Sequence, residues 1–277
     1  MDDITGFGAM CKAGADVLIR LIDALEKATG WVATQYLQRP SKQAQAFMIQ
    51  SIKDNTHYSD FEKAVLISNV KILLKQHTNQ EIIVKFAAQF MAPTAKPETV
   101  NPDWLSVFMD YAKNVSIEEM QLVWGKLLAT EVSDPGTVPQ KVMYILATLD
   151  PDTARDFNTL LSNSLVTSEG NYIPIVQHSH DAVLDTENME ELVSAGLVYL
   201  QSFLGFGVDL PSRTLSYFDT VIRIDDDHIR NGCMLLSKCG QTLAHIIKVE
   251  KDDQFIERCV KILQKEDYKV TISHNPV

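Results

Sequence analysis

The sequence predicts a mainly α protein whose last part is an α+β module. Apolar residues recur three and four residues apart through most of the first 165 positions, which is the spacing of amphipathic helices. Capping residues and prolines precede several of these segments, as they do at helix starts. After residue 165, short β-branched and aromatic runs alternate with turn residues, which is typical of strands.

Composition limits the classes of function. The chain has 277 residues, of which 45% are hydrophobic, and this length allows two compact domains. Its net charge of −11 disfavours nucleic acid and anionic lipid, because no run of Lys or Arg offsets the repulsion. The first residues lack the basic segment of a signal peptide, so we expect a cytoplasmic protein. Four cysteines, none in a C-x-x-C pair, are expected to be reduced thiols: Cys11, Cys233, Cys239 and Cys259.

The segment 1–40 is expected to hold one long helix, from Gly6 to Gln38, which Arg39–Pro40 ends. Its charged residues share one narrow face, and most of its remaining girth is small or apolar. Such a helix is either the centre of a bundle or a segment that self-associates or lies at a membrane surface. Both interpretations stay open, and the residues of the possible interaction face are Leu18, Leu21, Leu25 and Trp31.

The segment 41–92 is expected to be a further helical region. A polar helix should cover Ser41–Asp54, and Ser59 with Glu62 forms an S-x-x-E capping box for the next helix. We expect Asn79 to open another helix. Three prolines make Met91–Pro102 the best linker candidate.

The segment 101–165 is expected to form a central four-helix unit. Each helix has its own start signal, and Asp134-Pro135-Gly136 should be a turn because proline presets φ and glycine tolerates positive φ. The four starts are Asn101–Pro102, Ser116 with Glu119 as a capping box, Thr137 with Gln140, and Asp150–Pro151.

This central segment also carries a motif. Its residues are Trp124, Leu127, Leu128, Ala129 and Glu131, followed by Pro135 and Gly136. The pattern W-x-x-L-L-A-x-E…P-G resembles that of an uncharacterised bacterial helical domain family, in which a Leu-Asp…Ala…Phe segment follows, here Leu149–Asp150, Ala154 and Phe157. Related helical families are associated with abortive phage infection. The resemblance implies a helical fold and an antiviral context, with no catalytic residue, and helical spacing makes the motif structural.

The segment 166–277 is expected to be a winged-helix-like α+β module. The order of helix, glycine, strand, loop, strand and helix favours this fold, and Leu236–Leu243 resembles the L-T-x-x-G-x-x-L pattern that often follows a wing. The expected strands are Tyr172–Val176 at a sheet edge, Leu197–Leu204, Thr220–Ile224, Met234–Leu236 and Tyr268–Ser273. The expected helices are Thr186–Gly196, capped by Thr186, Lys238–Val249, capped by Ser237, and Phe255–Gln264.

Residues that could carry chemistry do not form a recognisable site. His178, His180 and Asp181 have the alternate spacing of metal ligands, yet the rest of a site is not visible. The run Asp225–His228 lacks the spacing of a calcium loop and reads as a charged hairpin tip. The sequence contains neither a nucleophile elbow nor a phosphate-binding glycine loop. We therefore predict no catalytic, cofactor-binding or metal residue, no cofactor and no enzyme.

These observations lead to two functional predictions. The first is a non-enzymatic protein of the phage-exclusion or abortive-infection type, which acts by protein–protein contact or through its apolar N-terminal helix. Its partner would be another protein or a second copy, with peripheral contact to the inner membrane through residues 6–38 as an open alternative. The second is a winged-helix DNA-binding transcriptional regulator, against which the acidic balance counts.

Overall fold

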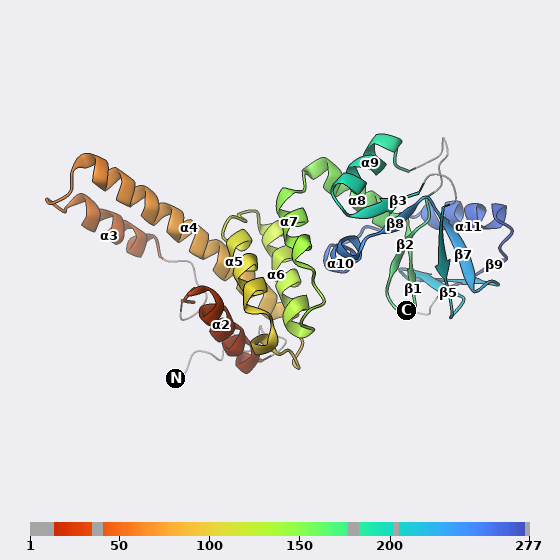
Figure 1. Ribbon diagram of the computed structural model, residues 1–277, viewed down its shortest axis with the longest axis horizontal. Coiled ribbons are helices and arrows are strands. Elements are labelled where there is room, and N and C mark those ends of the chain that lie inside the picture. The colour runs from red at the N-terminus through yellow and green to blue at the C-terminus, as the bar shows by residue number, and fades with distance from the viewer. Residues whose placement is uncertain (1–13, 35–40, 177–182, 202–204, 275–277) are drawn as a thin grey trace. The chain divides into compact units, whose positions relative to one another are not determined.

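The computed structural model describes residues 14–34, 41–176, 183–201 and 205–274. The chain divides into two compact units, Met1–Met143 and Tyr144–Val277 (Figure 1). The described part of the first unit is helical, and all the described strands lie in the second. The prediction of a mainly α chain is confirmed. The division falls inside a helix at 143/144, not at the predicted domain limits of 101 and 165.

The helices of the first unit follow the predicted segments closely. They are α2 (Ala15–Thr29), α3 (Lys42–Lys53), α4 (Asp60–Phe90), the 3-10 turn η1 (Pro97–Thr99), α5 (Pro102–Ala112) and α6 (Glu118–Ser133). Helix α7 (Gln140–Thr148) spans the division between the units. Because α8 belongs to the second unit, the central four helices do not form one compact unit by themselves.

Helix α2 is shorter than predicted. It ends at Thr29 because Gly30 adopts φ 72°, a left-handed conformation that suits glycine and closes the helix. Residues 31–34 are not helical, so the predicted end at Arg39–Pro40 is wrong, and 35–40 lie outside the described residues. The helix packs against α5 and η1.

Helices α3 and α4 form a hairpin (Figure 1). The hydroxyl oxygen of Ser41 accepts a hydrogen bond from the Ala44 N–H at 3.0 Å, which caps α3. The predicted Ser59–Glu62 capping box is present in full at the start of α4. Helix α4 then continues without a break for 31 residues, so the prediction that Asn79 starts a new helix is wrong. The Asn79 side chain instead turns inward and donates to the Lys113 carbonyl at 2.9 Å.

Two further predictions for this unit need correction. The proposed linker Met91–Pro102 is packed: Met91, Ala95 and Val100 are buried, and the Lys96 N–H donates to the Val132 carbonyl. The proposed Ser116–Glu119 capping box is absent, because α6 starts one residue later with Ile117 as its N-cap. The Ser116 hydroxyl faces Asn79 at 3.3 Å and contributes to a buried polar network instead.

The second unit combines helices with nine described strands. Its helices are α8 (Pro151–Ser162), α9 (Thr186–Ser194), α10 (Lys238–Ile246) and α11 (Phe255–Lys265). Its strands are β1 (Ser164–Thr167), β2 (Tyr172–Pro174), β3 (Val198–Leu200), β4 (Phe206–Asp209), β5 (Thr214–Tyr217), β6 (Thr220–Ile224), β7 (His228–Gly232), β8 (Met234–Leu236) and β9 (Val270–His274). The caps of α8 and α10 at Asp150 and Ser237 are as predicted, whereas Asp185, not Thr186, caps α9.

The strands form one larger and two smaller antiparallel sheets. The five-stranded sheet has the order β2-β1-β5-β6-β9, and two pairs, β3-β8 and β4-β7, complete the set. Pro174 lies in the edge strand β2, as predicted, because proline lacks the N–H that an inner strand needs. Helix α11 contributes Phe255, Cys259 and Leu263 to the hydrophobic core of the large sheet. Strands β1, β4, β5 and β7 were not predicted.

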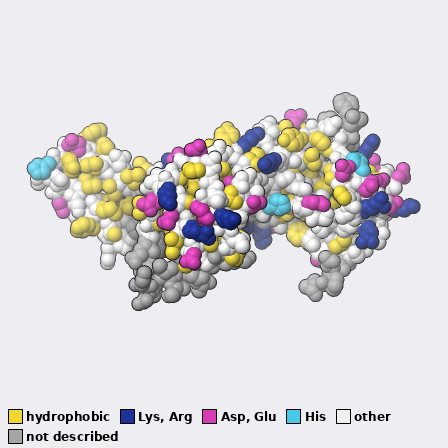
Figure 2. Space-filling view, turned by 60° about the horizontal axis from the view of Figure 1, so that its bottom comes forward, with side chains coloured by type: hydrophobic (Ala, Val, Ile, Leu, Met, Phe, Trp, Pro, Cys, Tyr) yellow, Lys and Arg dark blue, Asp and Glu magenta, His cyan; other side chains and the backbone are white. Residues whose placement is uncertain are grey.

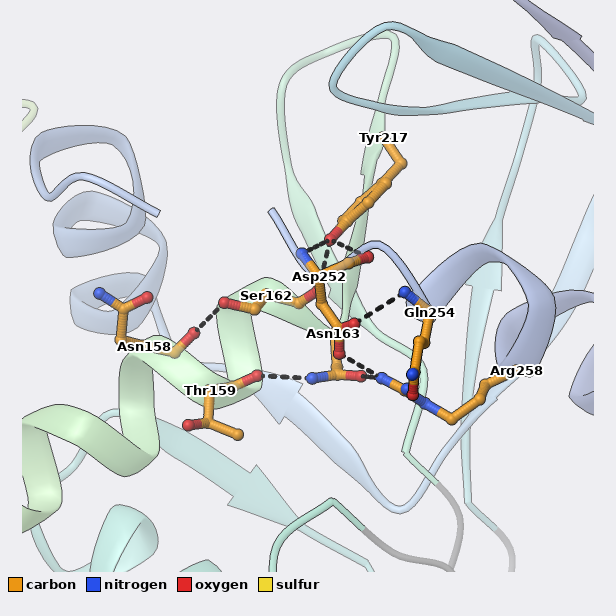
Figure 3. A network of polar contacts seen from close by, with 8 residues as sticks. All are labelled: Asn158, Thr159, Ser162, Asn163, Tyr217, Asp252, Gln254 and Arg258. Atoms are coloured by element: carbon orange, nitrogen blue, oxygen red, sulfur yellow. Dashed lines mark hydrogen bonds and ion pairs between the residues drawn. The ribbon is translucent and has the colours of Figure 1, made fainter. Parts of the chain in front are cut away.

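A polar network ties β5 to α8 and to the segment before α11 (Figure 3). The buried Tyr217 hydroxyl lies 3.0 Å and 3.2 Å from the carbonyls of Ser162 and Asp252 and accepts from the Asp252 N–H at 2.7 Å. The Arg258 guanidinium donates to Asp252 and to Asn163. Burial raises the pKa of the Tyr217 hydroxyl. Burial also disfavours the charged form of Asp252, but the hydrogen bond from Arg258 stabilises that form and leaves the pKa of the carboxyl lowered. With three contacts on its hydroxyl, Tyr217 serves as a structural tie.

Candidate interaction surface

The predicted family motif lies where α6 packs against α4, the most extensive helix pair of the first unit. The side chains of Trp124, Leu127 and Leu128 are fully buried, and Ala129 is nearly so. Trp124 also contacts the rings of Phe108 and Tyr111, with ring centroids 5.4 and 6.0 Å apart. These residues therefore form the core of the unit, and none is exposed for binding.

A glycine inside the motif explains how closely α4 and α6 approach. A Cβ atom added to Gly125 would lie 2.5 Å from the Phe86 Cβ and 3.0 Å from the Ala87 nitrogen. Any larger residue would push the two helices apart, because a separation below 3.0 Å is a steric clash. The motif thus contains the one residue type that this helix crossing tolerates.

The remaining motif residues build the turn after α6. The buried Glu131 carboxylate accepts hydrogen bonds from the Gly136 N–H at 2.7 Å and the Val138 N–H at 2.9 Å. The indole N–H of Trp104 donates to the Val138 carbonyl at 3.0 Å, so the turn is held from two sides. Gly136 has φ 90°, which glycine adopts without strain. Glu131, Pro135 and Gly136 are therefore structural, and this role needs no ligand.

The predicted interaction face of the N-terminal helix is covered within its own unit. Leu18, Leu21 and Leu25 are buried, as α2 packs against α5 and η1. Trp31 is also buried and stacks on His77, with ring centroids 5.7 Å apart. In the described structure these four residues act as core. Any interaction surface in this unit must be sought elsewhere.

The exposed hydrophobic side chains of this unit concentrate on the α3–α4 hairpin, which the sequence analysis treated as ordinary helices. Helix α3 has no buried residue, and Phe47 is 75% exposed. On α4, Phe61 is 77% and Leu73 is 63% exposed. Figure 2 shows these yellow side chains gathered at its left end. We call this set the hairpin surface: Phe47, Met48, Tyr58, Phe61, Val65, Ile72 and Leu73.

The α4 part of the hairpin surface is an ordered stripe. Phe61, Val65 and Ile72 are spaced so that they project from one side of the helix, with the exposed Ser68 between them. Asp60, Lys71 and Lys75 follow one edge of this stripe, and all three are exposed. The stripe is therefore acidic at its start along this edge and basic about three to four turns later.

A groove of about 530 Å³ lies beside the same edge, between α3, α4 and the start of α6. Ile49, Leu74 and Ile82 give it an apolar part, and Lys71 and Lys75 contribute positive charge. The groove thus joins an apolar surface to a basic rim. Its polar lining consists of Gln45, Thr78, Asn79, Ser116 and Gln121.

The residues that the sequence analysis weighed for metal binding do not gather into a site. His178, His180 and Asp181 lie outside the described residues. Asp226 accepts from the His228 N–H in the bend before β7, and the His228 ring lies 2.8 Å from the Asp209 carboxylate. Among the described residues, no group of three or more His, Cys, Asp or Glu side chains could hold a metal ion.

The three described cysteines are buried thiols: Cys233, Cys239 and Cys259. Burial raises the pKa of the Cys259 thiol to about 12, so this thiol stays protonated and unreactive at neutral pH. Within the described ranges, no helix combines the length and the apolar composition that a membrane crossing needs.

Comparison with known proteins yields one match. Residues 68–184 match the model of a family described as a protein of unknown function (DUF2806). This span contains the whole motif from Trp124 to Gly136, but it leaves out α3 and the start of α4, with Phe61 and Val65. No curated protein matches the chain, and no solved structure does.

Proposed function

We propose that this protein acts without enzymatic chemistry, through a protein–protein contact made by the hairpin surface. The observation that carries the proposal is the grouping of seven large hydrophobic side chains, each at least 38% exposed, on two adjacent helices and the turn that joins them. Scattered apolar side chains are normal on a protein surface, whereas contiguous apolar patches mark interaction sites.

The composition of the hairpin surface supports a protein partner. Three of its members are aromatic, namely Phe47, Tyr58 and Phe61, and aromatic side chains and Met are enriched in the cores of interfaces. Charged residues flank the stripe instead of interrupting it, as in an interface with an apolar centre and a polar rim. The surface lies on the same continuous helix as the packed half of α4, in which Ile83, Val84 and Ala87 are buried.

We place this contact in phage exclusion of the abortive-infection type, in the cytoplasm. What supports this context is the resemblance of the Trp124–Gly136 motif to an uncharacterised bacterial helical family, whose related helical families are associated with abortive infection. The packing of the motif agrees with a division of roles, in which the motif builds the scaffold and the hairpin meets the partner.

The test is a double variant, Phe61→Glu with Leu73→Glu, in cells that carry the gene and are challenged with phage. Both side chains are exposed, so folding should be retained while the apolar contact is lost. Tyr144→Glu, which alters an exposed aromatic residue of α7, is the matched control. We expect the wild type and the control to reduce phage plating and the double variant not to. Equal protection by all three proteins would contradict the proposal.

The alternative is a winged-helix DNA-binding regulator built on the second unit. What supports it is the order of α9, β3, β8 and α10, with β3 and β8 paired antiparallel. Residues 201–233 separate the two strands, and strand β6, which lies between them in the sequence, pairs with β5 and β9. With a net charge of −11, we expect no retardation of random duplex DNA near 150 mM salt. Tight binding under these conditions would favour the regulator.

A further inference from the structure

We infer that the partner of the hairpin surface is a second copy of this chain, docked antiparallel about a two-fold axis that passes near Ile67 of α4. The inference rests on the proposed function, since it names the occupant of the same surface. In this dimer the two α3–α4 hairpins form a four-helix arrangement in which each copy covers the apolar stripe of the other.

The first argument is the distribution of charge along one edge of the stripe. Asp60 stands at the start of α4, and Lys71 and Lys75 follow on the same edge. A two-fold axis perpendicular to two antiparallel helices brings the same edge of both together, with their directions reversed. Asp60 of each copy then meets Lys75 of the other, and the pairing occurs twice. A parallel arrangement about a two-fold axis would place this edge against the opposite edge of the other copy, so the Asp60–Lys75 contacts would not form.

The second argument comes from the apolar residues. When Asp60 meets Lys75 of the second copy, Phe61 comes opposite Leu74, two residues from Ile72, and Val65 comes opposite Val70, two residues from Ser68. The axis that pairs Phe61 with Ile72 and Val65 with Ser68 therefore lies one residue, about 1.5 Å along the helix, from the axis that pairs Asp60 with Lys75. Phe61 is the most exposed large hydrophobic residue of the stripe, and this arrangement removes the Phe61 side chains of both copies from water.

The third argument is size. Residues 60–78 of α4 extend about 28 Å at 1.5 Å per residue. Together with α3, which lies alongside, this face approaches the roughly 800 Å² that each partner buries in a stable interface. The two copies use one identical patch, so the assembly closes as a dimer.

The experiment is a charge reversal in the full-length chain, read by light scattering after size exclusion over a range of concentrations. We expect the wild type to be a dimer. Asp60→Lys alone creates two Lys–Lys contacts and Lys75→Asp alone creates two Asp–Asp contacts, so each variant should dimerise more than about tenfold more weakly, a change of about 1.4 kcal/mol. Lys141→Asp, the same charge change on an exposed lysine of α7, should leave the dimer intact.

Mixing the two weakened variants is the decisive step. A mixture of Asp60→Lys and Lys75→Asp restores both complementary contacts in a heterodimer, so dimerisation should return on mixing, and it should weaken as salt rises. If Asp60→Lys impairs folding, judged by its melting curve, Asp60→Asn replaces it: this variant removes both Asp60–Lys75 contacts without adding a charge, so dimerisation should weaken and depend less on salt. No recovery on mixing, or an Asp60→Asn variant that dimerises as strongly as the wild type, would overturn the antiparallel arrangement.

The outcomes also separate this inference from the proposed function. A monomeric wild type whose protection against phage still depends on Phe61 would overturn the second copy as partner and leave the hairpin contact standing. If Phe61→Glu dimerises as strongly as the wild type, the interface lies elsewhere on the chain. A monomer that floats with phosphatidylserine vesicles would assign the surface to lipid and overturn the dimer.

Discussion

The two halves of helix α4 differ in what covers them. From Asn79 onward, Ile83, Val84, Ala87 and Ala88 are buried, because α6 approaches closely at Gly125. From Asp60 to Thr78, no residue is buried, although this half is also rich in large apolar side chains. One continuous helix thus serves as core at one end and as exposed surface at the other. Apolar spacing predicts that a face needs a partner, but it does not say whether the partner lies in the same chain.

This contrast implies that substitutions at the two ends have different consequences. In the covered half, and in α6 which covers it, a change should alter the free energy of unfolding. In the exposed half, a change should leave folding nearly intact and alter association. Four substitutions test this difference, beginning with the largest expected effect.

Trp124→Ala should be the most damaging change. The side chain is fully buried and contacts Phe108 and Tyr111, so truncation removes transfer free energy and leaves a cavity. Such a change costs on the order of 3–5 kcal/mol. Urea unfolding followed by circular dichroism measures the loss. A variant with wild-type stability would show that the α4–α6 contact is not the core of this unit.

Glu131→Ala should have the next largest effect and lower the free energy of unfolding by about 2–3 kcal/mol. The N–H groups of Gly136 and Val138 lose a charged hydrogen-bond acceptor in a buried turn. The same unfolding measurement applies. Glu118→Ala, at an exposed position of the same helix, is the control and should have little effect. Similar losses for both variants would argue against a special role for the buried carboxylate.

Ser59→Ala should cost about 1 kcal/mol of helix stability, the usual effect of removing an N-cap. This loss belongs to the exposed half, and hydrogen exchange of the first turns of α4 should reveal it more clearly than global unfolding. Faster exchange near Glu62 with unchanged exchange near Val84 is expected. Equal acceleration at both places would show that the two halves unfold together.

The same cap predicts a dependence on pH. Hydrogen bonds from the Ser59 hydroxyl and from the Ser59 N–H lower the pKa of Glu62 below its ordinary value of 4.5. A carboxyl with a lowered folded pKa contributes stability above its unfolded pKa and loses it as the pH falls through the folded value. Local exchange at the start of α4 should therefore rise as the solution is acidified below pH 4.5, and Ser59→Ala should reduce this dependence.

Leu73→Ser should have the smallest effect on folding, within about 0.5 kcal/mol, because the side chain is already mostly in water. Association should nevertheless weaken, as measured by light scattering. Leu127→Ser is the opposite case, with a buried leucine of similar size that should unfold the protein. If Leu73→Ser also destabilised the fold strongly, the hairpin surface would have to be covered within its own chain.

Local signals predicted the starts of several elements correctly. Asn101 before Pro102, Asp150 before Pro151, Ser59 with Glu62, and Ser237 all cap helices as expected. These interactions join residues two or three positions apart, so the sequence contains all the information they need. The burial of Trp124 and its neighbours also followed from helical spacing.

Predictions that depended on distant residues were less accurate. Ser116 has the spacing of a capping residue, yet its hydroxyl pairs with Asn79, which lies 37 positions earlier in the chain. The proline-rich Met91–Pro102 has the composition of a linker, yet α6 and α2 pack against it. Strands β1 and β5 are only four residues each, and they pair with each other across about 50 positions of the chain, a contact that a short sequence window does not contain.

The sequence by itself determined that the chain is mainly helical, where most helices start, and which faces are apolar, because those features depend on caps and on spacing within one helix. Only the tertiary structure decided which apolar face remained exposed. Leu21 and Leu73 both lie on apolar helical faces. Helix α5 and the turn η1 pack against α2, and Leu21 is buried, whereas Leu73 stays 63% exposed among the described residues although α3 packs against α4. Burial is a property of what the rest of the chain brings near a residue, and periodicity within a helix does not contain that information.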